Sequence, residues 1–455
     1  MSTSDKRFRF PTKLPAEGGQ IYGPKQRRVE GVLLELADSL SCRLGMSRRR
    51  FLGTASGMAA AFLAMNAVHG PLFAVDPVEA ADPGAAGERL ESLRDQFIFD
   101  VQTHFVSDRY TGKGLLGLRE LAKEWNPQLK GEQTLEDLRY ANYLKEVFLE
   151  SDTTIGLLSS APADNPDSWF LHNPQIFAAR EKINAEASSR RLLAHAIFTP
   201  GQPGWLEDLD EVLEYRPDSW KGYTLGSPSG SKWPWRLDDQ ELVYPAYEKM
   251  LKAEVPIVCI HKGLLPRRLR SGSHWEYAGT GDIGRAARDW PLLTFAIYHS
   301  AIRSGSPPTA KEAAQFEERG YIAWVSDLAK IPTEWGVDNV YAELGSVFAV
   351  TAISNPRYCA GILGTLIKGL GHERVLWGTD SVWYGSPQWQ IEALRRLEIP
   401  EDLRRKFGFE ELGPADGPVK KAILGGNAAR LYGVTAGRAA FAHDRIASLK
   451  RAGAG

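Results

Sequence analysis

The chain has 455 residues, 43% of them hydrophobic, and its 55 Lys and Arg almost balance its 56 Asp and Glu, which leaves a formal net charge of −1. This length suits one large α/β domain or two to three smaller ones, and the lack of a basic excess argues against nucleic acid as a partner. The three cysteines lie far apart and form no Cys-x-x-Cys pair, which argues against a disulfide framework and against a thiolate zinc site.

The first feature along the chain is an export pattern. Ser47–Leu52 reads SRRRFL and precedes the weakly apolar run Gly53–Ala67. Adjacent arginines followed by Phe-Leu and a mild apolar segment predict a signal for the twin-arginine export machinery, with cleavage between Phe73 and Ala81 and delivery to the periplasm or the extracellular space. Asn66 interrupts the run, which is too short for a stable membrane span. An ordinary Arg-rich surface helix is the alternative.

Beyond this pattern, eight short runs rich in β-branched or aromatic residues alternate with longer segments of helical spacing. Such alternation implies parallel strands joined by right-handed crossovers, and eight repeats predict an α/β fold of the (β/α)8 TIM-barrel type with loop insertions at its C-terminal face. An open doubly wound sheet is the alternative, but no Gly-rich dinucleotide loop follows the first strand. The predicted strands are Phe97–His104, Thr153–Ser160, Leu192–Thr199, Trp220–Leu225, Pro256–His261, Leu293–His299, Val340–Leu344 and Val375–Thr379, and helices are predicted at Thr134–Glu150, Pro174–Arg190, Trp205–Tyr215 and Pro245–Ala253.

These elements set the expected domain boundaries. Residues 1–86 are expected to form an N-terminal extension with the export signal and a linker, and translation could start at Met1 or at Met46. We expect residues 87–436 to form the barrel and residues 437–455 to form a C-terminal tail.

Tryptophans are frequent in the loops that leave the C-terminal ends of the strands. These loops build the active site of a TIM barrel, so their aromatic side chains predict a substrate wall. The alternative is that they only pack the loops onto the barrel. The residues in question are Trp233 and Trp235 in the loop Gly226–Leu242, and Trp383 and Trp389 in the loop Ser381–Gln390.

Ionisable residues fall where several predicted strands end. Gln102 and His104 are two apart in the first strand and so share a face. His261 ends the fifth strand, His299 ends the sixth, and Asp380 directly follows the eighth. Imidazoles and a carboxylate meeting at one rim are a ligand set that suits Zn²⁺ or Mn²⁺. His195, by contrast, lies in mid-strand and is expected to be a hydrogen-bonded core residue.

These residues stand in motifs that resemble those of the amidohydrolase-related family, the branch of the amidohydrolase superfamily that includes aminocarboxymuconate-semialdehyde decarboxylase. The similarity spans about Phe97 to Val434. The first motif, Asp100–His104 (DVQTH), is similar to the family's D-x-H-x-H. The others are Ile260–Gly263 (IHKG), Ile297–Ser300 (IYHS), Trp377–Asp380 (WGTD) and the closing segment Gly425–Gly433 (GGNAARLYG).

The resemblance implies one divalent metal ion, Zn²⁺ or Mn²⁺, and a homodimer. It implies that His104 and His261 bind the metal, that Asp380 is a ligand or a proton-transfer group, and that His299 polarises or protonates the substrate. Gln102 stands where the family usually has a ligand histidine, so we count it as a ligand. Because a neutral amide oxygen is a poorer donor to Zn²⁺ than an imidazole, the metal is expected to be weaker, harder or absent.

Two further positions bear on the metal count. Thr224 stands where some members of the superfamily carry a bridging lysine, so a two-metal site is not expected. Glu343, in the seventh strand, is either an additional carboxylate ligand or a partner for a polar group of a neighbouring strand.

The leading functional hypothesis is a metal-dependent hydrolase of a C–O or C–N bond in a small cyclic or aromatic compound, with Asp380 as base and His299 at the carbonyl oxygen. The alternative is a non-oxidative decarboxylase of an aromatic or dienoic acid. The arginines after the fifth strand then either bind the substrate's carboxylate or belong to a solvated loop. A third possibility is an exported binding protein without catalysis. The arginines in question are Arg267, Arg268 and Arg270.

Overall fold

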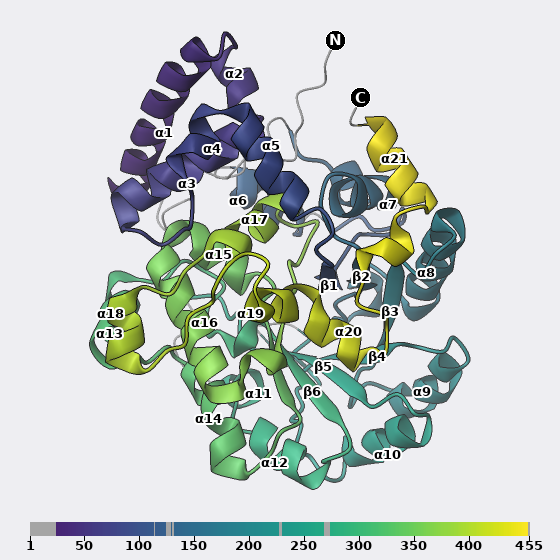
Figure 1. Cartoon of the computed structure of the whole chain (residues 1–455). Helices are drawn as coiled ribbons and strands as arrows, with labels where there is room; N and C mark the ends of the chain where they lie inside the picture. The colour runs from purple at the N-terminus through teal and green to yellow at the C-terminus, as the bar shows by residue number, and fades with distance from the viewer. Residues whose placement is uncertain are drawn as a thin grey trace.

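The computed structural model describes residues 24–112, 114–123, 129, 132–226, 230–267 and 274–453. Its centre is a sheet of eight parallel strands in the order of the chain, surrounded by helices (Figure 1). This is the predicted (β/α)8 barrel. The strands are β1 (Phe99–Thr103), β2 (Ile155–Leu158), β3 (Leu192–Ile197), β4 (Ser219–Tyr223), β5 (Ile257–His261), β6 (Thr294–Tyr298), β7 (Val340–Glu343) and β8 (Val375–Leu376).

The barrel closes where the chain beyond β8 runs alongside β1. The Val101 amide donates to the Trp377 carbonyl at 2.9 Å, and the Asp380 amide donates to the Gln102 carbonyl at 3.0 Å. A parallel bridge joins Thr103 to Ser381. The pairing of β1 with β2 shifts register between Asp100 and Thr103, an irregularity of the kind that redirects side chains at barrel rims. Closure therefore brings Asp380 next to the end of β1.

Helices follow most strands and cover the outside of the barrel, as expected for this fold. The predicted helix Thr134–Glu150 is divided into a 3-10 helix (Leu135–Leu138), α7 (Tyr140–Tyr143) and a π-helix (Leu144–Leu149). The other long helices are α6 (Leu116–Lys123), α8 (Asn173–Ala187), α9 (Trp205–Leu213), α10 (Tyr244–Lys252), α12 (Ile283–Asp289), α13 (Ala310–Arg319), α14 (Val325–Trp335), α15 (Val347–Ser354), α16 (Pro356–Leu370), α17 (Gln388–Arg396) and α18 (Glu401–Phe407).

Short elements complete the frame around the rim and the closing segment. The closing motif forms a π-helix (Ala422–Gly426) followed by α20 (Asn427–Leu431). The remaining short helices are α11 (Trp275–Ala278), α19 (Pro418–Lys421) and 3-10 turns at Pro166–Ser168, His299–Ala301 and His372–Arg374.

The N-terminal segment, in which the signal and the linker are expected, is largely helical. It forms five helices that lie together beside α15 and α17 (Figure 1): α1 (Pro24–Arg43), α2 (Arg48–Phe51), α3 (Ala55–His69), α4 (Pro77–Ala81) and α5 (Pro83–Ser92). The expected boundary between residues 86 and 87 falls inside α5. The segment folds because α1 and α3 bury apolar side chains against each other and against the rest of the chain.

The expected C-terminal tail is also folded onto the barrel. A 3-10 turn (Arg438–Phe441) precedes α21 (Arg445–Gly453), and Phe441 is buried in the cluster that includes Phe99 and Cys259. Asp444 forms a buried ion pair with Arg191, with 2.5 Å between Asp444 Oδ2 and Arg191 Nε. Among the residues that the structure describes, no helix combines the length and apolar character that crossing a bilayer requires.

Candidate active site

The predicted metal ligands of β1 and of the segment after β8 meet in a small triangle of polar atoms. Gln102 Nε2 lies 3.0 Å from Asp380 Oδ1 and 3.4 Å from His104 Nε2. The third side, between His104 Nε2 and Asp380 Oδ1, measures 2.9 Å. All three side chains are buried. Three of the predicted ligands are thus in direct contact, although they come from opposite ends of the barrel sequence.

The two other predicted site residues form a pair beside this triangle. His299 Nε2 is 3.0 Å from His261 Nδ1 and 3.4 Å from Gln102 Nε2. His261 therefore reaches the triangle through His299, and its other face stacks on Tyr223, with 4.5 Å between the ring centroids. The five residues form one connected group at the C-terminal rim of the barrel.

Backbone carbonyls fix the orientation of two of the imidazoles. His104 Nδ1 lies 3.0 Å from the Ser159 carbonyl, and His299 Nδ1 lies 2.9 Å from the Gly345 carbonyl. Because a carbonyl only accepts, each Nδ1 donates, and the neutral ring keeps a lone pair on Nε2. His104 Nε2 faces the Asp380 carboxylate at 2.9 Å, so either a proton on Nε2 or a cation lies between the two atoms.

The triangle fits a single cation. Two donor atoms that each lie about 2.1 Å from one ion, at right angles, are about 3 Å apart, which is close to all three sides. Gln102 Oε1 is buried without a hydrogen-bond partner, and it shares with Glu343 Oε1 the space that a Cβ on Gly345 would fill. Turning the Gln102 amide by 180° would give Oε1 to a cation and the NH₂ group to Glu343.

Only two of these three donors belong to the usual metal-binding residue types. Within the described part of the chain, no group of three or more His, Cys, Asp and Glu side chains is arranged to hold a metal ion. A cation here would depend on the amide oxygen of Gln102 as its third protein ligand. Amide and carboxylate oxygens suit Mn²⁺ better than they suit Zn²⁺.

Burial and neighbouring groups set the charges of the cluster. Burial alone would raise the pKa of Asp380, but hydrogen bonding and charge from His104 and charge from His299 lower it to about 2. Burial lowers the pKa of His299 to about 4, and burial together with His299 holds the pKa of His261 well below its usual range. Near neutral pH, Asp380 is therefore ionised, and His261 and His299 are uncharged.

Two residues that the sequence did not single out hold the Asp380 carboxylate. Ser346 Oγ donates to Asp380 Oδ2 and lies 2.8 Å from the hydroxyl of Tyr384. Ser346 is the N-cap residue of α15, in the loop after β7, but its hydroxyl makes no capping hydrogen bond and donates to Asp380 instead. No local pattern reveals this contact, because it spans 34 residues.

Glu343 is a partner for polar groups of neighbouring segments, which is the alternative role that the sequence suggests for it. Its Oε2 accepts from the His299 backbone amide at 2.9 Å, and its Oε1 accepts from the Gly345 amide at 2.5 Å. Burial raises the pKa of Glu343 to about 8. Glu343 thus fixes the backbone of His299, which lies in the left-handed region with a φ of 59°. Asp100 has a similar role, because it accepts from the Thr379 and Gln102 amides at 3.0 and 3.1 Å.

Below the rim, the barrel interior holds polar groups on β3, β4 and β6. His195 is buried and bonded as expected, with Nε2 3.0 Å from the Tyr298 hydroxyl and Nδ1 2.8 Å from Ser219 Oγ. Lys221 was not foreseen. Its Nζ is buried without a hydrogen-bond partner and lies 3.1 Å from the centroid of the Tyr298 ring. The alternation of Ser219, Lys221 and Tyr223 along β4 is the sequence signal that would have placed Lys221 inside the barrel.

A cavity of about 270 Å³ opens beside His261. Tyr223, Phe170 and Tyr110 form its aromatic wall, and apolar residues such as Leu265 complete it. Among the described residues that line it there is no Asp, Glu, Lys or Arg. This volume lies at the small end of ordinary ligand pockets and suits a single substituted ring.

The tryptophans expected in the substrate wall do not line this cavity. Trp235 is buried and donates to the Tyr223 carbonyl at 2.7 Å, and Trp389 is buried in the hydrophobic core. Trp383 stacks on His104, with 5.3 Å between centroids, and so supports a site residue from behind. The alternative reading, in which these residues pack the loops onto the barrel, is correct for Trp235, Trp383 and Trp389.

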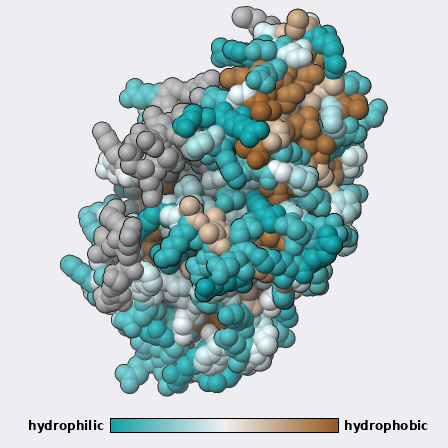
Figure 2. Space-filling model, turned by 90° about the vertical axis from the view of Figure 1, so that its left-hand side faces the viewer, coloured by the Kyte–Doolittle hydropathy of each residue, from teal (hydrophilic) through white to brown (hydrophobic). Residues whose placement is uncertain are grey.

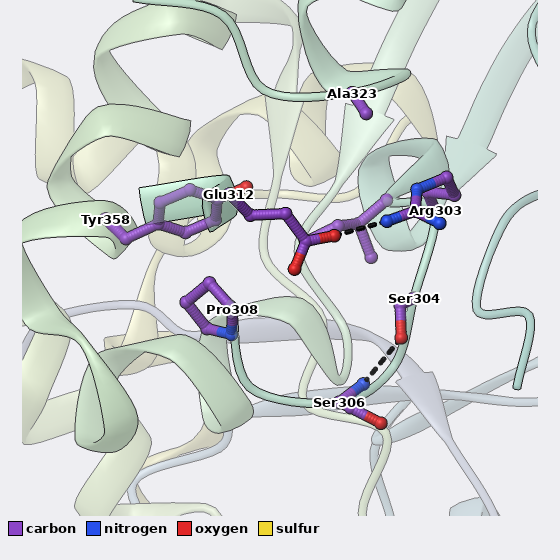
Figure 3. Close-up of a pocket in the computed structure, with 8 residues that line it drawn as sticks. Arg303, Ser304, Ser306, Pro308, Glu312, Ala323 and Tyr358 are labelled. Carbon is purple, nitrogen blue, oxygen red and sulfur yellow. Dashed lines mark hydrogen bonds and ion pairs between the residues drawn. The ribbon is translucent and has the colours of Figure 1, made fainter. Parts of the chain in front are cut away.

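Of the three arginines after the fifth strand, the structure describes only Arg267. Arg267 forms an ion pair with Glu312, with 3.0 Å between Nη1 and Oε2. Glu312 also pairs with Arg303 at the edge of a separate small pocket (Figure 3). Arg267 is thus engaged away from the cavity beside His261. Arg268 and Arg270 lie outside the described residues.

Comparison with known proteins finds one family model similar to this part of the chain. Residues 221–434 match the family model Amidohydro_2, described as amidohydrolase. This match confirms the resemblance that the motifs indicate, over the part of the chain that carries His261, His299 and Asp380. No curated protein matches the chain.

Among solved structures, the chain is similar to 5-carboxyvanillate decarboxylase LigW from Sphingomonas paucimobilis, at 14% identity over 75% of this chain and 100% of that one, with a TM-score of 0.43. It is also similar to a putative 2-pyrone-4,6-dicarboxylic acid hydrolase from Pseudomonas putida, at 16% identity over 74% and 98%, with a TM-score of 0.41. A third is 2,6-dihydroxybenzoate decarboxylase from Rhizobium, at 14% identity over 74% and 99%, with a TM-score of 0.42. Likeness at this level does not specify a reaction.

Proposed function

We propose that the protein is an enzyme that decarboxylates a small aromatic or dienoic carboxylic acid without oxidation, with one divalent cation at the triangle of Gln102, His104 and Asp380. The observation that carries the proposal is the aromatic cavity beside His261, which has no charged side chain among its described lining residues. An apolar wall holds the ring of such an acid and favours the conversion of a charged carboxylate into neutral CO₂.

The cation would supply the positive charge that holds the substrate's carboxylate and a neighbouring hydroxyl. Gln102, His104 and Asp380 would bind it, with His261 as the further ligand that the family resemblance implies. Mn²⁺ is the preferred ion, because two of the three triangle donors are oxygens once the Gln102 amide is turned.

The side chains around the cavity would bind the substrate ring and transfer the proton. Tyr223 and Phe170 would hold the substrate ring between apolar faces. As the bond between the ring and the carboxylate breaks and CO₂ leaves, a proton taken up from solvent would pass by way of Asp380 or His299 to the ring carbon, so that the acid RCOO⁻ and one proton yield RH and CO₂. Ser346 would keep the Asp380 carboxylate in its present orientation.

Hydrolysis of an ester, lactone or amide is the second candidate. It is favoured by the position of Asp380, whose ionised carboxylate sits in the triangle and could take a proton from water. The same residues would bind the cation, and His299 would hydrogen-bond the carbonyl oxygen as negative charge develops.

One experiment separates the two reactions. The protein, loaded with Mn²⁺, is incubated with a panel of hydroxylated aromatic acids and of aromatic esters and lactones in ¹⁸O-labelled water. The proposal predicts release of CO₂ from an acid without ¹⁸O in the organic product. Uptake of ¹⁸O without CO₂ would establish hydrolysis instead. No turnover with Mn²⁺, Zn²⁺ or Fe²⁺ would favour a binding protein without catalysis.

Export by the twin-arginine machinery, to the periplasm or the extracellular space, is part of the same proposal. The motif Ser47–Leu52 lies at α2, where Arg48, Arg49 and Arg50 are exposed. The twin-arginine signal is an address that a receptor reads, and exposed arginines are accessible to such a receptor. Replacing Arg49 and Arg50 by lysine should retain the protein in the cytoplasm, and unchanged export would contradict this part of the proposal.

A further inference from the structure

The segment with the export pattern is built into the fold. Most of α3, the helix that follows the twin arginines, is buried, including Phe62, Met65 and the alanines between Ala59 and Ala64. It contacts α1, α4 and α5, which lie around it (Figure 1). Figure 2 shows that hydrophobic residues also reach the surface in the upper part of one side of the molecule. A removable signal helix would not need the burial that α3 has.

The stretch in which cleavage was expected is held by backbone hydrogen bonds on both sides. The Ala74 amide donates to the Arg396 carbonyl at 2.7 Å, and the Glu398 amide donates to the Leu72 carbonyl at 2.7 Å. These bonds flank an antiparallel bridge between Phe73 and Leu397. A peptidase must bind its substrate as a free extended strand, and here the strand already has a partner.

The Asn66 side chain also forms hydrogen bonds with Leu72 and Phe73. Its Nδ2 donates to the Phe73 carbonyl at 2.8 Å, and its Oδ1 accepts from the Leu72 and Phe73 amides at 3.1 and 2.9 Å. Asn66, which interrupts the apolar run in the sequence, thus has a structural role. These three bonds fix the conformation of the chain where it leaves α3.

Ion pairs then attach α4 and α5 to the end of α17. Glu79 pairs with Arg396 at 2.5 Å, and Arg89 pairs with Glu392 at 2.9 Å. The Arg396 guanidinium also lies 5.3 Å from the centroid of the Phe62 ring. The side chains of Glu392 and Arg396 are only 1% and 4% exposed. Removal of the segment would open this buried, charged surface to water.

We propose that residues 46–92 remain in the mature protein, where α3, α4 and α5 clamp the C-terminal end of α17. This helix follows directly on the loop that carries Asp380 and Tyr384, so the clamp also supports the candidate active site. Retention of the segment does not depend on which reaction the site performs. The twin-arginine pattern, in this view, belongs to a permanent structural element.

The first test is the intact mass of the full chain, recovered with a C-terminal affinity tag from the producing cells, from both the cytoplasmic and the exported fractions. The proposal predicts a polypeptide that still contains α3 in every fraction that holds folded protein. A folded protein whose N-terminus lies between Phe73 and Ala81 would overturn it.

The second test asks whether the segment stabilises the barrel. Phe62→Ala should lower the Tm of the full chain by about 5 °C, because it empties a buried site. Leu292→Ala is the matched control, since Leu292 is 76% exposed, and its Tm should stay within about 1 °C of the parent value. Equal Tm values for the two variants would overturn the proposal.

A milder pair of variants keeps the test valid if Phe62→Ala does not fold. Glu79→Gln removes the charge that faces Arg396, whereas Glu91→Gln removes an exposed charge on α5 that pairs with Arg94. The proposal predicts a lower Tm for Glu79→Gln only. An unchanged Tm for Glu79→Gln would overturn the clamp.

Discussion

Gln102 Nε2 and Asp380 Oδ1 lie 3.0 Å apart across the seam of the barrel, although 278 positions separate them in the chain. The contact follows from the backbone pairing that closes the barrel, because the Asp380 amide donates to the Gln102 carbonyl. The amide and the carboxylate are thus fixed relative to each other by the backbone, together with the nearby imidazole of His104. This preorganised triangle is the centre of the functional proposal.

Gln102 is expected to decide the affinity and the choice of metal. Gln102→Ala removes one of three donors and should weaken Mn²⁺ binding by about tenfold or more. Gln102→His supplies an imidazole nitrogen, so it should shift the preference from Mn²⁺ towards Zn²⁺. Titration calorimetry with each ion measures both effects. Unchanged affinities in Gln102→Ala would show that the amide is not a ligand.

The two histidines beside the triangle should behave differently. His261→Ala should lower metal occupancy, because the family resemblance makes it a ligand. His299→Ala should retain the metal and lose turnover by about 100-fold or more, the usual range for a proton-transfer group. Metal analysis of each purified variant, paired with its rate, tests this division. Wild-type rates in both variants would contradict the assignment of the site.

Ser346 should act on the rate through Asp380. Ser346→Ala removes a hydrogen bond to a charged carboxylate, worth roughly 1.5–3 kcal/mol, and should reduce kcat by about tenfold or more with little change in KM. Ser304→Ala is the control, because the Ser304 hydroxyl accepts from the Ser306 amide in the separate pocket shown in Figure 3. A KM effect without a kcat effect would contradict this role.

Because of Lys221, the free energy of unfolding should depend on pH between about 7 and 10.5. Burial lowers the pKa of Lys221 from 10.5 to about 7 in the folded chain. Between these two values the unfolded chain binds more protons, so the free energy of unfolding rises with pH across this window. Lys221→Met should remove this dependence and raise the Tm at pH 7 by several degrees. Thermal unfolding between pH 7 and pH 10 tests it, and a parallel slope in the variant would contradict it.

Much of the fold follows from patterns that the sequence displays locally. Each strand is a short apolar run between helical segments, so β5 and β6 were predicted to within one residue at each end. The strand ends then placed His261, His299 and Asp380 at one rim, because all strands of such a barrel point the same way. The alternation of strands and helices alone was sufficient to place these three residues at one rim.

What the sequence did not reveal depends on contacts between distant segments. The alternation along β4 can place Lys221 inside the barrel, but only the packed barrel shows that its amine is buried without a hydrogen-bond partner. Ser346 and Tyr384 reach Asp380 from different loops. The helix α3 has the composition of a signal peptide, and its burial depends on α1 and on Arg396, which no local pattern connects to it.

The most direct test of the central claim is an anomalous-scattering map from a crystal of the full chain grown with Mn²⁺ and recorded at the manganese edge. One peak is expected within bonding distance of Gln102 Oε1, His104 Nε2 and Asp380 Oδ1, with the Gln102 amide nitrogen turned towards Glu343. A map without a peak there, in which Gln102 Nε2 still bonds to Asp380, would contradict it.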